Sequence, residues 1–346
     1  LYTSGTTGPP KGVVLSQRAK AIQYLASAAE FGIGAPSERS LTVGPLTHGA
    51  TLGLAIATIN AGGRVVALPL FHPEAIFRQV ELHRITNFAV VPTHLKVLLE
   101  FGASDARELD TSSLRHIVVG GAALPLALKE QAIEFFGPGI VQENYGSSEI
   151  GVSSWLRPED QLRKHGSVGQ PFHSVTIRIV GEDGAEVPIG QVGSLQLKAP
   201  TAFDGYWRRP ADTAAAFRDG FFVTRDLARL DEEGFIYLCD RIDDSINTGG
   251  LTVLPREIED VLVRHPDVAQ AVAFGVPDVH LGEAVRAAVV LRPGGERDVR
   301  GLLAFSAANL GREKRPKAID IVAEIPTDAT GKILRRRLRD PFWALE

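Results

Sequence analysis

The start of the chain gathers hydroxyls, small residues and a lysine in one run, Tyr2-Thr3-Ser4-Gly5-Thr6-Thr7-Gly8-Pro9-Pro10-Lys11-Gly12. Glycines let backbone N–H groups approach an anion closely, the Ser and Thr hydroxyls add donors, and the lysine adds a mobile positive charge. These are the groups that bind a polyphosphate. The spacing does not fit the G-x-x-x-x-G-K-[ST] pattern, so the run is not a Walker A loop. A flexible surface loop rich in Gly and Thr is the alternative.

The same run resembles, almost letter for letter, the phosphate-loop signature of the adenylate-forming superfamily. This superfamily includes acyl-CoA synthetases, peptide-synthetase adenylation domains and beetle luciferases. The resemblance implies that Thr3 to Gly8 and Lys11 bind the phosphates of ATP. Further segments similar to the family's motifs follow in the family's order and cover essentially the whole chain. Only the family's start has no counterpart, because its large domain is longer than the stretch before Asp243.

A second segment, Asn144-Tyr145-Gly146-Ser147-Ser148-Glu149, follows a candidate strand and looks like the family's Y-G-x-T-E motif. Its aromatic ring can stack on adenine, and the hydroxyl of Ser148, where Thr is usual, can reach the α-phosphate. The carboxylate of Glu149 can hold Mg²⁺, which prefers hard oxygen ligands and shares them with phosphates. Without the family resemblance, a strand-ending turn with a solvated Glu would be the better explanation.

Three shorter segments are similar to motifs that surround the family's substrates. Gly120-Gly121-Ala122-Ala123-Leu124-Pro125 resembles the lining of the adenine and acyl pocket, and ligands of open α/β sheets bind at the carboxyl ends of strands. Pro45-Leu46-Thr47-His48-Gly49 implies that His48 gates the acyl pocket or contacts the adenylate, although a lone His is more often structural. Thr224-Arg225-Asp226 has Arg225 in place of the family's Gly, and Asp226 would accept hydrogen bonds from the ribose hydroxyls. A plain turn is the alternative for the first and third segments.

The segment Asp240-Arg241-Ile242-Asp243-Asp244-Ser245-Ile246-Asn247-Thr248-Gly249-Gly250 resembles the junction between the family's large and small domains. The match continues through Val253, Pro255, Glu257, Ile258 and Glu259. It implies that Arg241 contacts the nucleotide and that Asp243 is the hinge. Gly249 and Gly250 would line the thiol tunnel after the small domain rotates. The polar, Gly-bearing composition also suits an ordinary linker.

The segment Pro326-Thr327-Asp328-Ala329-Thr330-Gly331-Lys332-Ile333-Leu334-Arg335 resembles the family's C-terminal P-x-T-x-x-G-K-I-x-R motif. The resemblance makes Lys332 the catalytic lysine. A single ammonium on a flexible stem can bridge the attacking carboxylate oxygen and the α-phosphate. Basic residues then cluster at Arg335, Arg336, Arg337 and Arg339, and we interpret this run as a solvated helix face.

Hydrophobic patterning predicts a large domain that positions these motifs. In the first two thirds, short β-branched runs alternate with helical patterns, which predicts parallel α/β layers. The expected strands are Arg64–Leu68, Phe88–Val91, Leu114–Val119 and Ile140–Glu143, and the expected helices are Ala19–Phe31, Pro73–Ile85 and Leu126–Phe136. Gly49–Gly63 predicts a buried helix. Beyond Phe172, alternation in Val175–Val180 and Gly193–Leu197 predicts a small antiparallel β subdomain.

A smaller α+β domain is expected after the polar segment Asp240–Gly250, and the family resemblance makes it a lid. We therefore predict that residues 1–243 are the C-terminal portion of a large AMP-binding domain and residues 244–346 a small mobile domain. Its expected elements are helices Pro255–His265, Arg297–Leu310 and Ile333–Arg339 and strands Val268–Phe274, Ala284–Leu291 and Ala318–Val322.

Bulk properties narrow the class of protein. The formal net charge is −4, so no global field draws the chain to nucleic acid or to an anionic membrane. No stretch reaches the roughly 18 apolar residues that span a bilayer. Cys239 is the only cysteine, which rules out an internal disulfide and suits the cytoplasm. The chain lacks Met and opens on its most informative motif, so we expect a longer protein whose N-terminal part is missing here.

The sequence therefore predicts an acyl-CoA synthetase that uses ATP, Mg²⁺ and CoA with a small-molecule carboxylic acid, fatty acids being the first guess and aryl acids the next. No general base is required, because a carboxylate is already ionised at neutral pH. An adenylation enzyme that passes the acyl group to a carrier protein is the nearest alternative, and a nucleotide-binding relative that is inactive as this fragment is another. The identity of the acid and the oligomeric state stay open.

Overall fold

The computed structural model describes residues 1–3, 10–44, 46–47, 49–104, 109–241, 244–327 and 333–343. Its contacts divide the chain into two compact units. The first unit comprises Leu1–Thr224 and Arg229–Leu238, and the second comprises Arg225–Ala228 and Cys239–Glu346. Each unit is described by itself. The domain boundary expected after Asp243 stays a prediction, since that residue lies outside the described ranges.

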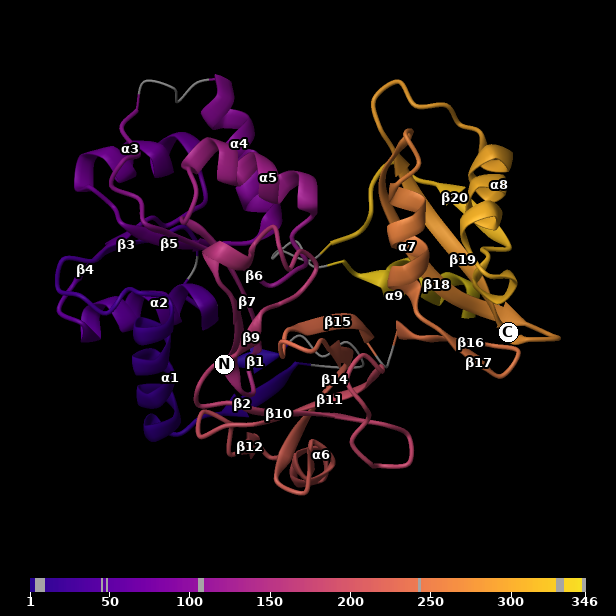
Figure 1. The fold of residues 1–346 in the computed structure, drawn as a ribbon, viewed down its shortest axis with the longest axis horizontal. Helices are drawn as coiled ribbons and strands as arrows, with labels where there is room; N and C mark the ends of the chain where they lie inside the picture. The colour runs from indigo at the N-terminus through magenta and orange to yellow at the C-terminus, as the bar shows by residue number, and fades with distance from the viewer. Residues whose placement is uncertain are drawn as a thin grey trace. The chain divides into compact units, whose positions relative to one another are not determined.

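A seven-stranded sheet with the order β4-β3-β5-β6-β7-β8-β9 organises the first unit (Figure 1). Its strands are β3 (Arg39–Thr42), β4 (Arg64–Ala67), β5 (Asn87–Val90), β6 (His116–Gly120), β7 (Val141–Ser147), β8 (Gly151–Leu156) and β9 (Gln170–Pro171). All pairings from β4 to β7 are parallel, whereas β8 and β9 are antiparallel. The parallel α/β layers predicted from the sequence are therefore confirmed.

Five helices flank this sheet: α1 (Gln17–Glu30), α2 (Gly49–Asn60), α3 (Pro73–His83), α4 (Pro92–Ser104) and α5 (Leu126–Phe136). Local signals explain their starts, because Ser16 caps α1 by accepting a hydrogen bond from the Ala19 N–H, and Pro73 occupies the first turn of α3. The expected buried helix is α2, but it is buried on one face only, and Ile59 is 57% exposed. No expected element corresponds to α4.

Antiparallel strands confirm the predicted β subdomain, and most of their residues belong to the first unit, whereas Arg225–Ala228 of β14 and the last three residues of β15 belong to the second. One sheet contains β10 (Thr176–Val180), β11 (Gly193–Lys198), β13 (Phe217–Arg218), β14 (Phe221–Leu230) and β15 (Ile236–Arg241). A smaller sheet has the order β1-β2-β12 and contains β1 (Tyr2–Thr3), β2 (Lys11–Val14) and β12 (Gly205–Tyr206). The short helix α6 (Pro210–Ala215) follows β12. The small sheet thus joins the start of the chain to residues about two hundred positions later.

The second unit has the expected α+β order. Its sheet runs β17-β16-β19-β18, with β20 beside β19, and its helices are α7 (Pro255–Val263), α8 (Val299–Asn309) and α9 (Arg335–Trp343). The strands are β16 (Ile246–Thr248), β17 (Leu251–Val253), β18 (Val268–Asp278), β19 (Gly282–Leu291) and β20 (Ala318–Ile321). An apolar cluster that includes Ile258, Leu262 and Val289 lies between the sheet and its helices.

Two expectations for the second unit need correction. The segment Asp240–Gly250 is not a simple linker, because it contains the end of β15 and all of β16, which pairs with β17 in a tight hairpin. The last helix begins at Arg335 rather than Ile333 and continues past Pro341 to Trp343. Within the described residues, no helix is both long and apolar enough to cross a bilayer.

Candidate active site

A chain of polar contacts in the first unit joins Lys11 to Glu149. The Lys11 Nζ atom lies 2.5 Å from Oδ1 of Asp212 and 4.9 Å from the centroid of the Tyr206 ring. The Tyr206 hydroxyl donates a hydrogen bond of 2.9 Å to Oε1 of Glu149. The predicted phosphate-binding lysine and the predicted metal-binding carboxylate therefore share one intervening aromatic ring.

Backbone pairing sets this arrangement. Strand β12 pairs with β2, so that Tyr206 lies opposite Val13 and Gly205 opposite Val14. The Phe203 N–H donates to the carbonyl oxygen of Glu149 at 2.7 Å, which fixes the loop that precedes β12 against the end of the Asn144–Glu149 segment. Gly205 has φ +142°, and a Cβ there would lie 2.6 Å from Thr213 Cγ2, so the close approach requires glycine.

The carboxyl ends of β6 and β7 bring two of the predicted nucleotide segments together. Gly120 pairs with Asn144 across these parallel strands. A Cβ on Gly120 would lie 2.2 Å from Asn144 Oδ1, so a larger residue there would require the Asn144 side chain to move. The following residues, Gly121, Ala122 and Ala123, are exposed, and Gly121 has the left-handed φ of +84°. This is the edge of an open α/β sheet at which ligands bind.

The Asn144–Glu149 segment is only partly buried, which leaves its polar groups accessible. Strand β7 shifts register against β8 between Tyr145 and Gly146, and a Cβ on Gly146 would lie 2.2 Å from the Gly151 carbonyl oxygen. The Ser147 hydroxyl accepts a 3.3 Å hydrogen bond from the Glu149 N–H. Tyr145, Ser148 and Glu149 are all half-buried, as ligand-contacting groups at a strand end would be.

In the second unit, the structure brings Asp226 and Arg241 together. The Nε atom of Arg241 lies 3.2 Å from Oδ1 of Asp226, and the two side chains are 32% and 15% exposed. Arg225, which replaces the family's Gly, has φ +67°, a left-handed conformation that few non-Gly residues adopt. Arg225 thus adopts a backbone conformation that favours glycine, inside strand β14.

A buried charge cluster surrounds Arg335, which corrects the expectation of a wholly solvated helix face. Its guanidinium contacts Asp244 at 2.8 Å and Glu259 at 2.6 Å, and Asp240 lies 4.0 Å away. The Arg335 side chain is 15% exposed. Burial raises the pKa of Asp240 and of Glu259, and the nearby Arg335 counteracts this effect. Arg336 and Arg337 are exposed, as expected for a solvated helix face.

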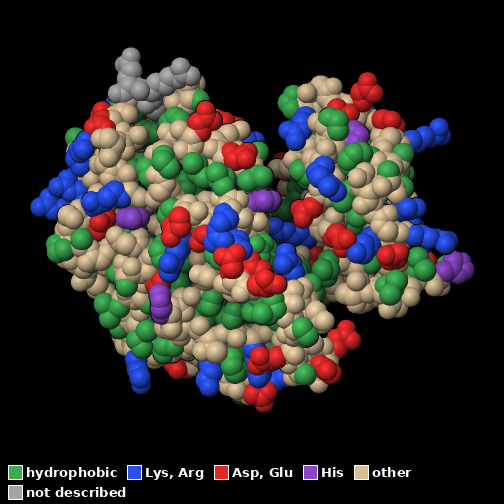
Figure 2. Space-filling view, viewed as in Figure 1, with side chains coloured by type: hydrophobic (Ala, Val, Ile, Leu, Met, Phe, Trp, Pro, Cys, Tyr) green, Lys and Arg blue, Asp and Glu red, His purple; other side chains and the backbone are tan. Residues whose placement is uncertain are grey.

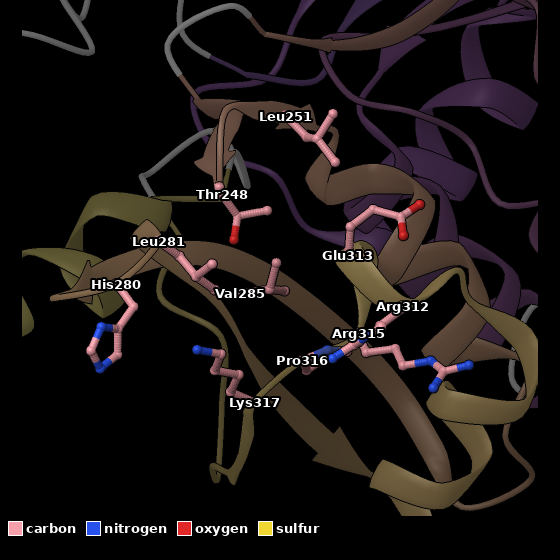
Figure 3. Close-up of a pocket in the computed structure, with 11 residues that line it drawn as sticks. Thr248, Leu251, His280, Leu281, Val285, Arg312, Glu313, Arg315, Pro316 and Lys317 are labelled. Atoms are coloured by element: carbon pink, nitrogen blue, oxygen red, sulfur yellow. The ribbon is translucent and has the colours of Figure 1, made fainter.

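A pocket of about 590 Å³ opens in the second unit beside the β16–β17 hairpin (Figure 3). It is lined by Thr248, Gly249, Leu251, His280, Leu281, Val285, Arg312, Glu313, Arg315, Pro316 and Lys317. Figure 3 shows Lys317 extending toward His280 and Leu281. Its Nζ atom lies 2.7 Å from Asp278 Oδ2. Three cations, Arg312, Arg315 and Lys317, and one carboxylate, Glu313, thus line the cavity. The lining also includes Gly249, one of the two predicted tunnel glycines. The other, Gly250, follows it with φ +83°.

Several predicted site residues lie outside the described residues: Ser4, Gly5, Thr6, Thr7, Gly8, His48, Asp243 and Lys332. Thr3 belongs to β1, whose partner is β2. Sequence reasoning missed Tyr206, Asp212 and the cationic segment Arg312–Lys317. The available signals were the clustered cations Arg312, Lys314, Arg315 and Lys317 and the Gly205-Tyr206 pair.

The donor set of the first unit fits a magnesium ion that is bound together with phosphates. Among the described residues, no group of three or more His, Cys, Asp or Glu side chains could hold a metal. Magnesium in nucleotide sites needs only one or two carboxylates, because the phosphates and water supply its other ligands. Oε1 of Glu149 accepts the Tyr206 hydrogen bond, and the described residues provide no partner for Oε2.

Comparisons with known proteins identify the family to which the chain is similar. The family model "AMP-binding enzyme" matches residues 1–207, and the model "AMP-binding enzyme C-terminal domain" matches residues 257–332. The medium/long-chain-fatty-acid–CoA ligase FadD8 of Mycobacterium tuberculosis is 37% identical over 99% of this chain and 61% of its own length. The fatty acid–[acyl-carrier-protein] ligase ScoC of Streptomyces coeruleorubidus is 37% identical over 99% of this chain and 67% of its own length.

A solved relative is the O-succinylbenzoate coenzyme A synthetase MenE of Bacillus subtilis in complex with ATP and magnesium ion. It superposes with a TM-score of 0.86 and 32% identity, covering 98% of this chain and 69% of MenE. The chain spans about three fifths of the length of FadD8.

Proposed function

Because the chain belongs to the AMP-binding enzyme family, we propose that it activates a carboxylic acid with ATP and transfers the acyl group to CoA. The observation that carries this proposal is the contact chain from Lys11 through Tyr206 to Glu149. It unites three segments that are far apart in the sequence. It also places an ammonium, which can bind phosphate, and a carboxylate, which can hold Mg²⁺ together with phosphates, against the same ring.

In the first half-reaction, a carboxylate oxygen of the acid attacks the α-phosphorus of ATP. The new P–O bond forms as the bond to the β-phosphate oxygen breaks, and pyrophosphate leaves. We assign Lys332 and Ser148 to the charge that develops on the α-phosphate, and Lys11 with Thr3–Gly8 to the departing phosphates. Glu149 would hold Mg²⁺, which would neutralise phosphate charge. The acid needs no base because it is already ionised.

The nucleotide is held by polar groups from the remaining motifs. We assign Asn144, Tyr145 and Gly121–Ala123 to the adenine, since the first two flank the edge at which β6 and β7 end. Asp226 accepts from the ribose hydroxyls, and its ion pair with Arg241 orients this carboxylate. We assign His48 to gating of the acyl pocket or to contact with the adenylate.

In the second half-reaction, the CoA thiolate attacks the acyl carbonyl carbon and AMP leaves. CoA carries a pyrophosphate and a 3′-phosphate, so its binding site needs clustered cations. The pocket that contains Gly249 supplies Arg312, Arg315 and Lys317, which supports CoA as the acceptor. Asp243 acts as the hinge, and Gly249 and Gly250 line the path of the thiol. The likeness to FadD8 supports a fatty acid as the substrate.

Transfer to a carrier protein is the alternative acceptor reaction, and the likeness to ScoC supports it. The two acceptors make different demands on the cationic pocket, because CoA carries a pyrophosphate and a 3′-phosphate that the thiol arm of a carrier protein lacks. A cytoplasmic location stays a prediction from the sequence.

A panel of carboxylic acids tests this proposal on the full-length protein with ATP and Mg²⁺, with and without CoA. We expect pyrophosphate release with medium or long fatty acids and an acyl-CoA product by mass spectrometry. Adenylate formation without thioester, relieved by a carrier protein, would favour the alternative acceptor. ATP binding without pyrophosphate release from any acid would contradict an activating enzyme.

A further inference from the structure

Tyr206 faces two charged groups from other parts of the chain, and the proposed function assigns a role to both. Its hydroxyl contacts Glu149, and its ring contacts the ammonium of Lys11. No motif in the sequence includes this tyrosine. Its side chain is half-buried, so both contacts lie partly out of water, where they are stronger than on an open surface.

The hydrogen bond to Glu149 has a defined direction. An ionised carboxylate only accepts hydrogen bonds, so the phenol must donate to Oε1. This donation occupies one oxygen and limits the rotation of the carboxylate, which leaves Oε2 to a ligand. A partner that orients a metal-binding side chain in this way is worth 10–100-fold in metal affinity or activity in other proteins.

The ring of Tyr206 acts on Lys11 from the other side. The ammonium lies 4.9 Å from the ring centroid, within the 6 Å range of a cation–π contact. Asp212 contacts the same ammonium at 2.5 Å, and Arg209 lies 3.4 Å from the other Asp212 oxygen. The lysine is therefore confined between a ring face and a carboxylate, although its side chain is 24% exposed and can exchange the carboxylate for phosphate.

The position of the ring is itself determined by the backbone. The Tyr206 N–H donates to Thr213 Oγ1 at 2.9 Å, and that hydroxyl donates to the Arg209 carbonyl oxygen. The Phe203 ring contacts the Tyr206 ring edge-on with centroids 4.9 Å apart. The Phe203 N–H also binds the Glu149 carbonyl oxygen, so Glu149 is held by its backbone and by its side chain from the same loop.

We propose that Tyr206 is a positioning residue for the magnesium–ATP complex: its hydroxyl orients Glu149 toward the metal, and its ring face holds the Lys11 ammonium at a fixed distance from that carboxylate. The proposal rests on the proposed function, because it takes the ligand of Glu149 to be the metal of ATP. It adds a residue that touches neither the metal nor the phosphates.

The test measures metal binding apart from turnover. In the full-length protein, Mn²⁺ is titrated into the enzyme–ATP complex and free Mn²⁺ is followed by electron paramagnetic resonance. Tyr206→Phe keeps the ring and removes the donor, so Mn²⁺ affinity should fall 10–100-fold. The affinity for ATP without metal should stay within about twofold, because the ring still faces Lys11. Tyr206→Leu, which also removes the ring, should weaken both.

The matched control is Tyr24→Phe. Tyr24 lies in α1 with the Lys20 ammonium 5.7 Å from its ring centroid, so it repeats the lysine-over-tyrosine contact, and no described contact joins it to Glu149. Its Mn²⁺ affinity should equal that of the wild type. Glu149→Gln provides a second background, in which adding Tyr206→Phe should cause no further loss, since the two act through one ligand.

The outcomes separate this proposal from the proposed function. Mn²⁺ affinity in Tyr206→Phe within twofold of the wild type, or tighter, would overturn the positioning role while leaving the function intact. Full additivity in the Glu149→Gln background would overturn it as well. A wild-type protein that binds neither ATP nor Mn²⁺–ATP would refute the proposed function, and this inference with it.

Discussion

The charge cluster around Glu149 and the one around Arg335 use similar residues for opposite purposes. At Glu149, a neutral tyrosine separates the carboxylate from the Lys11 ammonium, and that ammonium pairs with Asp212, which is itself 35% exposed. At Arg335, one guanidinium faces Asp240, Asp244 and Glu259, all inside the second unit. Charges held apart can bind a ligand, whereas charges that satisfy one another hold the fold together.

Surface charge gives no hint of this distinction. On the face shown in Figure 2, acidic and basic side chains are mixed. Most of the exposed ion pairs, such as Arg78 with Glu74, contribute little to stability. The two clusters differ from these pairs by their burial and by the number of groups that share one partner.

The largest effect is expected for Arg335→Ala. Removing the only guanidinium among three carboxylates leaves buried like charges without compensation, so the free energy of unfolding of the second unit should fall by about 3–5 kcal/mol. Urea denaturation of the full-length protein measures this change. Arg337→Ala, at an exposed position on the same helix, should change the stability by less than about 0.5 kcal/mol. An equal loss of stability in the two variants would show that the Arg335 cluster does not stabilise the fold more than an exposed arginine does.

Lys332→Ala should lower the adenylation rate and leave the stability unchanged, although Lys332 precedes Arg335 by only three residues. Losing one preorganised donor to the α-phosphate costs about 3–4 kcal/mol in the transition state, or roughly 10²–10³ in adenylation rate. ATP binding and the denaturation midpoint should stay close to those of the wild type. Exchange of pyrophosphate into ATP measures adenylation, and a rate within about tenfold of the wild type would contradict the catalytic role.

The Arg335→Ala defect should also depend on pH. Burial raises the pKa of Glu259 and Asp240, and loss of Arg335 raises it further. The folded state then binds more protons than the unfolded state above the ordinary carboxyl pKa, so stability decreases as the pH rises through that window. The variant should therefore be closer to the wild type at pH 5 than at pH 7. Denaturation curves at both pH values test this, and a deficit independent of pH would argue against unpaired carboxylates as its cause.

The smallest effect is expected at Asp278. There the pH dependence of stability has the opposite sign, because stability is lost as the pH falls. Hydrogen bonds from Lys317 and from the His280 and Leu281 N–H groups lower the pKa of Asp278 to about 2. The unfolded chain binds the proton first, so this contribution is complete above the ordinary Asp pKa and is lost as the pH falls toward 2. Asp278→Asn should flatten the acid limb of the stability curve. An unchanged acid limb would mean that the Lys317 contact carries no stability.

Elements with strong local signals could be predicted from the sequence. Helix α5 spans Leu126–Phe136 as expected, because Pro125 precedes it and Gly137 ends it. Helix α4 was missed, although its buried residues Leu95, Leu98, Leu99 and Gly102 have helical spacing. It begins at Pro92, two residues after β5 ends, so its first apolar residues merge with those of the strand.

The site could be predicted only where a motif marks it. Lys11 and Glu149 stand in recognisable segments, but Tyr206 and Asp212 acquire their roles from the pairing of β2 with β12 across about two hundred residues. No local pattern encodes that pairing. Arg335 was misjudged for a related reason: its three acidic partners lie between 76 and about 95 residues earlier in the chain, so the arginine run could not reveal its burial.

The glycine at position 120 limits how this protein can be re-engineered. Strands β6 and β7 meet there so closely that even a methyl group would overlap the Asn144 amide. A larger residue at position 120 would therefore require the Asn144 side chain to move, and Asn144 is one of the residues that we assign to the adenine. Libraries aimed at new acids should vary Ala122 and Ala123, whose exposed positions leave room for larger groups, and should keep residue 120 constant.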